Sequence, residues 1–325
     1  MRVIKDMSAE VPDTNGFYFR LDELSDETSR DNLYNGYNSI HNNFARGNRQ
    51  VALNIWMPTE FAQFKDHFNN NALEYNAQAT EVYGVCPLTI KWLNEVDKSR
   101  EYKYIFYPIN KKDIPTESTK KYDICYFGGI HSQLHLEGLV TMLKYNYRYM
   151  SMTHGINRTT RHCLSKATDL DLSHSDKIKR VGECKISLCY NIVPAEDQHI
   201  KAIKTYPNWN SNKAFTDIDS LRYFPQFKSR MHEAAMAKTL NLVYRDPWGI
   251  TEDYYTPDEE FVYFDSSDNL QEKIDEILNN WDFYEGMVER AYNKSLNYTT
   301  ENMMQIIEKG EVWNPHNVDP VDQIG

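Results

Sequence analysis

No stretch of this 325-residue sequence approaches the ~18 consecutive apolar residues of a membrane-spanning helix. Residues 1–16 also lack the apolar core of a secretory signal peptide, and neither internal repeats nor low-complexity segments occur. These absences exclude a membrane-spanning protein and a repeat protein. We therefore expect a soluble protein that works in the cytoplasm.

Paired cysteines are missing as well. The five cysteines are an odd number, and no two of them form a C-x-x-C pair. Several sit in apolar runs, such as YDICYF (122–127) and KISLCYN (185–191). Because thiols in such runs pack as small hydrophobic side chains, we expect them to be reduced and buried.

Positive charge is scarce relative to negative charge, with 36 Lys and Arg against 47 Asp and Glu and a net charge of −11. This balance disfavours a protein held on nucleic acid by bulk electrostatics, although a local basic groove stays open as an alternative. Aromatic residues are plentiful, since 23 tyrosines and 6 tryptophans are present. Their large amphipathic surfaces suit a core, a cleft, or stacking on sugars and bases.

The length and the apolar pattern predict two α/β domains. A chain of 325 residues exceeds the usual size of one hydrophobic core. Residues 110–121 are polar, contain a proline and lack periodicity, so we interpret them as the linker. The predicted domains cover residues 1–112 and residues 120–325. The last helix either stays with the second domain or crosses back to the first.

Strand-like and helical patterns alternate in both domains. In the first, the predicted strands are 51–57, 82–86 and 102–109, and a helix with proline in its first turn covers 87–96. In the second, the predicted strands are 122–127, 147–156, 184–194, 240–245 and 260–264. The predicted helices there are 132–146, 177–183, 230–239, 269–281 and 283–310. Repeated strand–helix–strand units predict a Rossmann-like domain.

Three segments of the second domain carry a family resemblance. They are FPQFKSRMHEAAMAKTLNLVYRD (224–246), FVYFDSSDNLQEKIDEIL (261–278) and AYNKSLNYTTENM (291–303). Their order resembles the C-terminal half of GT-B glycosyltransferases of the glycosyl transferase group 1 type. In that family a helix headed by a basic residue and EA is followed by a short strand and then by a V-x-F-x-D strand. The resemblance covers roughly residues 120–305, whereas residues 1–110 match only in outline. It implies two Rossmann-like domains that face each other across a cleft, closed by C-terminal helices.

The resemblance also implies a function. Such an enzyme moves a sugar from a nucleotide sugar, here expected to be a UDP-sugar, to an acceptor hydroxyl, with no cofactor and no essential metal. The first domain then presents the acceptor, and the second binds the donor. A glycan, a small molecule or a hydroxylated base in phage-type DNA remain open as acceptors, with DNA disfavoured by the net charge of −11.

The stretch around residue 230 suggests a donor clamp. Ser229 is a plausible N-cap, which places Lys228 and Arg230 at a helix start where both can hold a diphosphate. Glu233 lies one turn on and can accept hydrogen bonds from the ribose hydroxyls. The alternative is a surface ion pair between Arg230 and Glu233. Eight positions before Glu233, where retaining members of the family often carry a second glutamate, stands Pro225.

Glycines follow the first strand of the second domain. We expect Gly128 and Gly129 to let the backbone approach the donor phosphates, or simply to form a tight turn. His131 follows at once and is expected to face the donor in the catalytic site. His131 and His135 also have the i, i+4 spacing of a metal face. Because the zincin glutamate is absent there, no metal site is predicted.

Other candidates follow later strands and the first domain. His154, Arg158 and Asn191 come after predicted strands, at the carboxyl edge where open α/β sheets bind ligands, so each is expected to contact the donor. Glu60 is the candidate general base for the acceptor hydroxyl, and Trp56 is placed to stack on a sugar or base.

Two alternatives remain open. Asp169-Leu170-Asp171 matches the D-x-D motif with which GT-A glycosyltransferases hold Mn²⁺ or Mg²⁺, but polar neighbours predict a surface loop there. The second alternative is a non-catalytic module that binds nucleotides or carbohydrates on the same scaffold.

Overall fold

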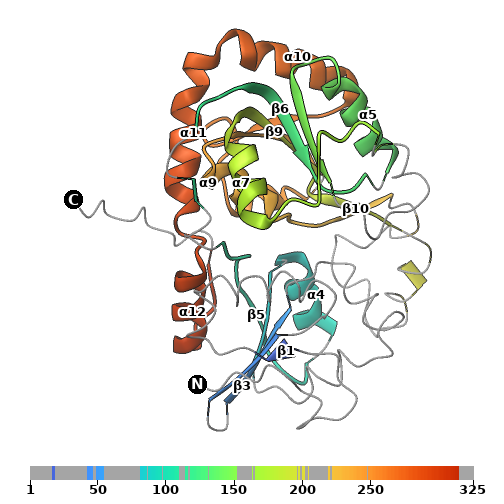
Figure 1. Ribbon diagram of the computed structural model, residues 1–325. Coiled ribbons are helices and arrows are strands. Elements are labelled where there is room, and N and C mark those ends of the chain that lie inside the picture. Colours follow the sequence, from blue (N-terminus) through green and yellow to red (C-terminus); the bar gives the residue numbers. More distant parts are fainter. Residues whose placement is uncertain are drawn as a thin grey trace. The chain divides into compact units, whose positions relative to one another are not determined.

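In the computed structural model the chain forms two compact units (Figure 1). The first comprises Met1–Asn110, Pro194–Phe227 and Thr299–Asn317, and the second comprises Lys111–Val193, Lys228–Tyr298 and Val318–Gly325. The residues that the structure describes are 17–18, 42–46, 49–54, 81–85, 87–96, 98–109, 114–115, 118–130, 132–151, 163, 165–195, 197, 200–201, 204, 219, 222–246 and 248–314.

The first unit contains a five-stranded sheet with the order β1-β2-β3-β4-β5. Its strands are β1 (Phe17–Tyr18), β2 (Asn42–Arg46), β3 (Arg49–Asn54), β4 (Glu81–Gly84) and β5 (Tyr102–Tyr104). Strands β2 and β3 are antiparallel, and the other neighbours are parallel. Helix α4 (Pro87–Val96) has the bounds that its N-terminal proline and apolar spacing predict, and it packs on β4 and β5.

The second unit is built around a six-stranded parallel sheet with the order β13-β12-β9-β6-β7-β8. Its strands are β6 (Tyr122–Phe127), β7 (Tyr147–Ser151), β8 (Asp169–Leu170), β9 (Cys184–Cys189), β12 (Leu240–Tyr244) and β13 (Val262–Phe264). Two further short strands, β10 (Ile192–Pro194) and β11 (Tyr223–Pro225), pair with each other. Central strands such as CKISLC and LNLVY are buried at all but one position each, as expected for strands covered on both faces.

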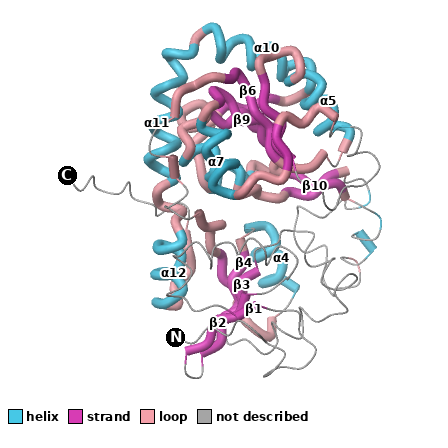
Figure 2. Tube along the Cα trace, in the orientation of Figure 1, coloured by secondary structure: helices cyan, strands magenta, loops and turns pink. Residues whose placement is uncertain are grey.

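Helices flank this sheet (Figure 2). They are α5 (Gln133–Met142), α7 (His174–Gly182), α9 (Arg230–Met236), α10 (Ser267–Asn279) and α11 (Trp281–Ser295). Helix α5 packs against α10, whereas α9 packs against both α7 and α11. Ala234 and Ala237 are fully buried in a cluster with Cys125, Phe127 and Ile178, so the small residues of α9 do bring this helix close to the sheet.

The predicted single helix over residues 283–310 is wrong. The chain forms α11 and then a separate helix, α12 (Thr300–Lys309), and Figure 1 shows the break between them. The Thr299 side chain caps α12 by accepting a hydrogen bond from the Asn302 amide. The Thr300 amide donates to the Ile109 carbonyl at 3.0 Å. A helix continued through Thr300 would lose both bonds, so the chain ends α11 and begins a new helix here.

Two further expectations concern the strands. The predicted strand over 102–109 ends at Tyr104, and the following residues stay buried with a single bridge between Ile109 and Thr299. The predicted strand over 184–194 is split into β9 and β10. A run of apolar residues signals burial, and burial alone does not require a hydrogen-bonded partner strand.

The cysteine expectation is confirmed for the described part of the chain. Cys125, Cys163, Cys184 and Cys189 are all buried and free of disulfide bonds. Burial raises the pKa of the Cys189 thiol to about 12, so this group is protonated and inert at neutral pH. Among the described residues, no helix is both long and apolar enough to cross a membrane.

Candidate functional site

The strand order of the second unit creates a topological switch point between β6 and β9, which we call the crevice. Strands β6 and β9 are neighbours, but the chain continues from β6 towards β7 and β8, and from β9 towards β12 and β13. The connections leave the carboxyl ends of β6 and β9 in opposite directions, so this end of the sheet opens at that point. Open α/β sheets bind ligands at such a point, which draws attention to Gly128 and Asn191, the residues that follow these two strands.

At Gly128, directly after β6, the backbone lies close to the side chain of Arg230. The φ of Gly128 is +126°, in the region that favours glycine, and its amide donates to the Met150 carbonyl at 3.0 Å. A Cβ atom at this position would lie 2.3 Å from Nη2 of Arg230. The next residue, Gly129, accepts a hydrogen bond from the Tyr126 hydroxyl at 2.8 Å. The Gly128-Gly129 turn is therefore shaped around a cation from another part of the chain.

Arg230, the first residue of α9, supplies that cation. Its guanidinium carbon lies 5.1 Å from the Tyr126 ring centroid and 5.6 Å from the Phe127 ring centroid. Both aromatic residues belong to the end of β6, and their rings attract the guanidinium through cation–π interactions. The positive charge is thus held at the carboxyl end of the strand, beside Gly128.

Asn191 ties the loop before α9 to the crevice. Its fully buried amide oxygen accepts a hydrogen bond from the Lys228 backbone amide at 2.9 Å. Its amide nitrogen donates to the Thr251 hydroxyl at 2.8 Å. The side chain therefore joins β9, the Lys228 loop and the start of the short 3-10 helix η6 (Ile250–Asp253). This arrangement suits a residue that positions the Lys228 loop.

Lys228 is a second cation at this place. Burial, and then the positive charge of Arg230, lower the pKa of its side chain to about 7. The nearby Cys189 acts in the opposite direction, but with a smaller effect. An anion that binds beside this amine stabilises its charged form, which burial and the charge of Arg230 disfavour. Lys228 and Arg230 together form a site that favours negative charge.

Glu233 lies one turn beyond Arg230 and is only 1% exposed. One carboxylate oxygen is 2.8 Å from Nζ of Lys177 in α7, and the other accepts a hydrogen bond from the Ser229 hydroxyl at 3.2 Å. Ser229 is the N-cap residue of α9, but its side chain bonds Glu233 and makes no capping bond to a backbone amide. The alternative expectation of a surface ion pair between Arg230 and Glu233 does not fit, because Glu233 is buried.

Lys177 is the functional candidate that the sequence pattern did not identify. It sits in the middle of a polar helix, HSDKIKRVG, with other basic residues around it. Nothing local distinguishes it from Lys179 or Arg180. Only the packing of α7 against α9 brings its ammonium group to Glu233.

Several predicted site residues lie outside the described residues, namely Trp56, Glu60, His131, His154 and Arg158. His135, the second residue of the two-histidine spacing, is a core residue that is 3% exposed. Its Nδ1 lies 2.6 Å from the Ser132 hydroxyl, and its ring packs against Tyr190 with the centroids 4.6 Å apart. Within the described part of the chain, no group of three His, Cys, Asp or Glu side chains is arranged to hold a metal ion.

The D-x-D motif does not form the surface loop that its polar neighbours predict. Asp169 and Leu170 form β8, the edge strand that pairs with β7, and Asp171 follows with a φ of +52°. The Asp169 carboxylate lies 3.2 Å from Nη1 of Arg148 and 3.9 Å from Nε of Arg180. These two cations neutralise the carboxylate that a D-x-D site would offer to a metal.

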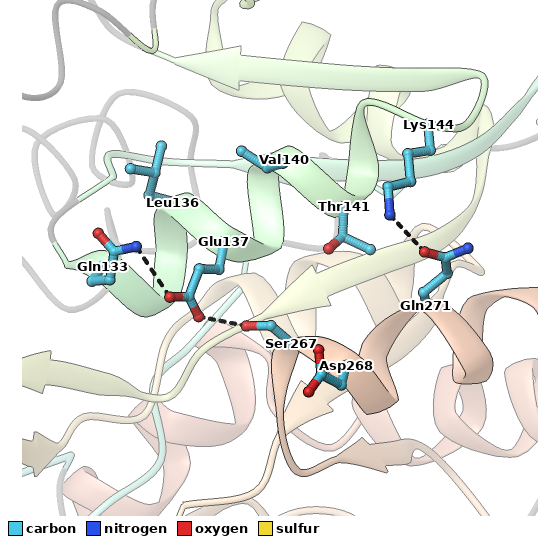
Figure 3. Close-up of a pocket in the computed structure, with 9 residues that line it drawn as sticks. All are labelled: Gln133, Leu136, Glu137, Val140, Thr141, Lys144, Ser267, Asp268 and Gln271. Atoms are coloured by element: carbon cyan, nitrogen blue, oxygen red, sulfur yellow. Dashed lines mark hydrogen bonds between the residues drawn. The ribbon is translucent and has the colours of Figure 1, made fainter.

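A separate groove of about 400 Å³ lies between α5 and α10 (Figure 3). Its polar groups bond one another: Glu137 accepts from Gln133 at 3.0 Å and from Ser267 at 2.6 Å, and Lys144 donates to Gln271 at 2.6 Å. Both hydrogen bonds lower the pKa of Glu137, so its carboxylate is ionised at neutral pH and is unsuited to act as a general acid. The groove contains none of the crevice residues described above.

A family model described as glycosyl transferase-like matches residues 196–309, which include Lys228, Arg230 and Glu233. Residues 196–309 are therefore similar to a glycosyl transferase-like domain. This match confirms the family resemblance that residues 224–303 predicted. No curated protein matches this chain.

Solved glycosyltransferase structures share the fold. Sucrose-phosphate synthase from Thermosynechococcus elongatus matches with a TM-score of 0.54 at 10% identity, covering 85% of this chain and 69% of that one. HepE from Anabaena, solved in complex with UDP, matches with a TM-score of 0.53 at 10% identity, covering 80% and 71%. A variant of TarM from S. aureus, solved with UDP and α-GlcNAc-glycerol among its ligands, matches with a TM-score of 0.51 at 10% identity, covering 75% of this chain and 46% of TarM.

The chain therefore has the GT-B fold, as predicted. It spans about half the length of TarM, because the match covers 46% of that chain. At 10% identity these similarities establish the fold, while the chemistry has to be argued from the residues of this chain.

Proposed function

We propose that the glycosyl transferase-like chain transfers a sugar from a nucleotide-sugar donor to an acceptor hydroxyl. The observation that supports this most strongly is the meeting of two cations with a glycine turn at the crevice between β6 and β9. Arg230 approaches Gly128 so closely that a Cβ there would lie 2.3 Å from Nη2. The backbone amide of Lys228 is held by Asn191, and the charge of Arg230 acts on the Lys228 side chain by lowering its pKa.

The chemistry of glycosyl transfer fits these groups. When the bond between sugar and phosphate breaks, negative charge builds up on the departing nucleoside diphosphate. Fixed positive groups at that place stabilise the transition state more than the ground state. Arg230 offers a planar donor fork for the phosphate oxygens, and Lys228 offers an ammonium group. The Gly128-Gly129 turn allows the phosphates to approach the backbone.

The remaining parts of the donor site are assigned by their position. Glu233 is proposed to accept hydrogen bonds from the ribose hydroxyls, because it lies one helical turn from the diphosphate clamp. Asn191 is proposed to hold the clamp loop. His131, His154 and Arg158 stay predictions for donor contacts, since they lie outside the described residues. UDP is the proposed carrier, supported by the UDP that HepE and the TarM variant contain.

The acceptor is proposed to be a hydroxyl of a carbohydrate or small molecule. The net charge of −11 disfavours a nucleic acid acceptor. Residues 1–112 are proposed to supply the acceptor side, with Glu60 as general base, and residues 120–325 the donor side. No cofactor and no essential metal are proposed, because Lys228 and Arg230 provide the positive charge that a metal supplies in D-x-D enzymes.

The decisive experiment uses a panel of UDP-, GDP- and ADP-sugars. The full chain is incubated with each donor, and release of nucleoside diphosphate is measured with and without a mixture of sugar acceptors. Turnover of one donor that increases with acceptor supports the proposal. Tight binding of a donor without release or transfer favours the non-catalytic module, and absence of binding to every member of the panel contradicts both.

A further inference from the structure

The Lys177–Glu233 ion pair lies beside the proposed nucleotide site. Nζ of Lys177 is 2.8 Å from one oxygen of Glu233, whose side chain is 1% exposed, whereas the Lys177 side chain is 23% exposed. The two residues come from α7 and α9, which pack against each other (Figure 1). A carboxylate buried to this extent requires a counterion, and Lys177 provides it.

Both oxygens of Glu233 already have partners. Ser229 donates to one oxygen at 3.2 Å, and Lys177 occupies the other at 2.8 Å. Because Glu233 is only 1% exposed, a ribose reaches its carboxylate only if a neighbouring group moves aside. Ser229 belongs to the first turn of α9 and moves only with the helix. Lys177 is the partner that can leave, because its ammonium group stands on a flexible four-carbon stem that reaches solvent.

The route open to Lys177 leads towards the diphosphate clamp. Its Nζ lies 5.4 Å from the Phe127 ring centroid, and Phe127 immediately precedes Gly128. The guanidinium carbon of Arg230 lies 5.6 Å from the centroid of the same ring. Lys177 and Arg230 thus share an aromatic neighbour that tolerates a cation, and the flexible stem of Lys177 gives its ammonium group a route from Glu233 towards Arg230.

We propose that Lys177 exchanges partners when the nucleotide binds. In the free protein it neutralises Glu233, and in the complex the two ribose hydroxyls donate to Glu233 while the ammonium group contacts the diphosphate. The two hydroxyls replace the hydrogen-bond donor that leaves Glu233, and the ammonium group gains a contact with the negatively charged diphosphate. Lys177 is thus a specificity residue that admits a ribose only together with phosphate. This inference rests on the proposed function of the crevice.

The test compares two probes, UDP and uridine, on Lys177→Met and on the matched control Lys179→Met. Lys179 lies on the same helix and is exposed, so its replacement makes the same change in charge away from Glu233. Dissociation constants are measured by calorimetry for UDP and by competition for uridine. In Lys177→Met we expect UDP to bind about tenfold more weakly, since a charge-assisted contact is lost. Uridine should bind at least as tightly as to the wild type, because its ribose no longer competes with an ammonium group. Lys179→Met should bind both probes like the wild type.

Parallel weakening of UDP and uridine in Lys177→Met would overturn the exchange, because it would show that Lys177 only supports Glu233. Unchanged UDP affinity would overturn it as well. Lys177→Gln, which keeps a donor for Glu233 without the charge, serves the same comparison if Lys177→Met does not fold. If the wild type itself binds none of UDP, GDP and ADP, the proposed function fails, whereas failure of the exchange alone leaves wild-type UDP binding intact.

Discussion

The guanidinium of Arg230 fills the space that a side chain at position 128 would occupy, since a Cβ on Gly128 would lie 2.3 Å from Nη2. Gly128 also has a φ of +126°, which other residues rarely adopt. The two residues are therefore matched: the glycine at the end of β6 makes room for the cation at the start of α9.

Gly128→Ala is expected to damage the site and the fold together. The methyl group displaces the end of the Arg230 side chain and strains the backbone, so the free energy of unfolding should fall by about 1–3 kcal/mol. UDP affinity should fall as well. Urea unfolding and UDP titration measure the two effects. Gly286→Ala, within α11, is the matched control and should be neutral or slightly stabilising, because the nearest atom to its Cβ lies 3.4 Å away. Wild-type UDP affinity in Gly128→Ala would contradict the match.

Removal of the clamp should weaken donor binding without unfolding the protein. Arg230→Ala and Lys228→Ala each remove a charge-assisted contact to the diphosphate, which costs about 1.5–3 kcal/mol of binding free energy. Calorimetric titration measures the affinity for UDP, and thermal melting shows whether each variant is folded. If both variants bind UDP with wild-type affinity, the diphosphate does not lie at these residues.

Nucleotide binding is expected to take up protons near pH 8. The pKa of Lys228 is lowered to about 7, so at pH 8 most of the free protein carries a neutral amine. A bound diphosphate favours the charged form and raises this pKa, so the complex holds up to about one more proton. Titration of UDP in two buffers with different ionisation enthalpies measures the uptake. Lys228→Met should abolish it, and equal uptake in that variant would assign the proton to another group.

Glu233→Gln is expected to reduce recognition of the ribose. The amide keeps the shape of the side chain but loses the charge-assisted bonds to the hydroxyls, so the Kd for UDP should rise. A 2′,3′-dideoxy analogue of UDP cannot form these bonds. The wild type should bind the analogue more weakly than UDP, and the variant should show a smaller difference. Equal discrimination by both proteins would make Glu233 a structural partner of Lys177 alone.

Chelation by EDTA should leave activity intact, because Lys228 and Arg230 are proposed to neutralise the leaving diphosphate without a metal. Asp169→Asn and Asp171→Asn should keep their turnover for the same reason. The Asp169 change should cost some stability instead, since its carboxylate pairs with Arg148 and Arg180. Loss of activity in EDTA that Mn²⁺ restores, together with inactive Asn variants, would favour the D-x-D alternative.

The local structure of this protein can largely be read from its residue pattern. Its apolar periodicities predict the alternating strands and helices, α4 has the predicted bounds, and the alanines of α9 mark a helix that packs closely on the sheet. The basic residue and the EA pair in RMHEAAM also identify the end of that helix that lies at the crevice. These features are readable because they depend on residues a few positions apart, whose spacing reports burial and backbone geometry directly.

The tertiary structure alone decided which of these residues meet. Lys177 reaches Glu233 only because α7 packs against α9, and Arg230 reaches Gly128 only because β6 lies next to β9 in the sheet. The start of α12 likewise depends on a distant carbonyl, that of Ile109, which accepts from the Thr300 amide. Such contacts follow from the strand order and the layer packing of the whole unit. No spacing along the chain encodes them, since each joins segments that are far apart in sequence and adjacent only after folding.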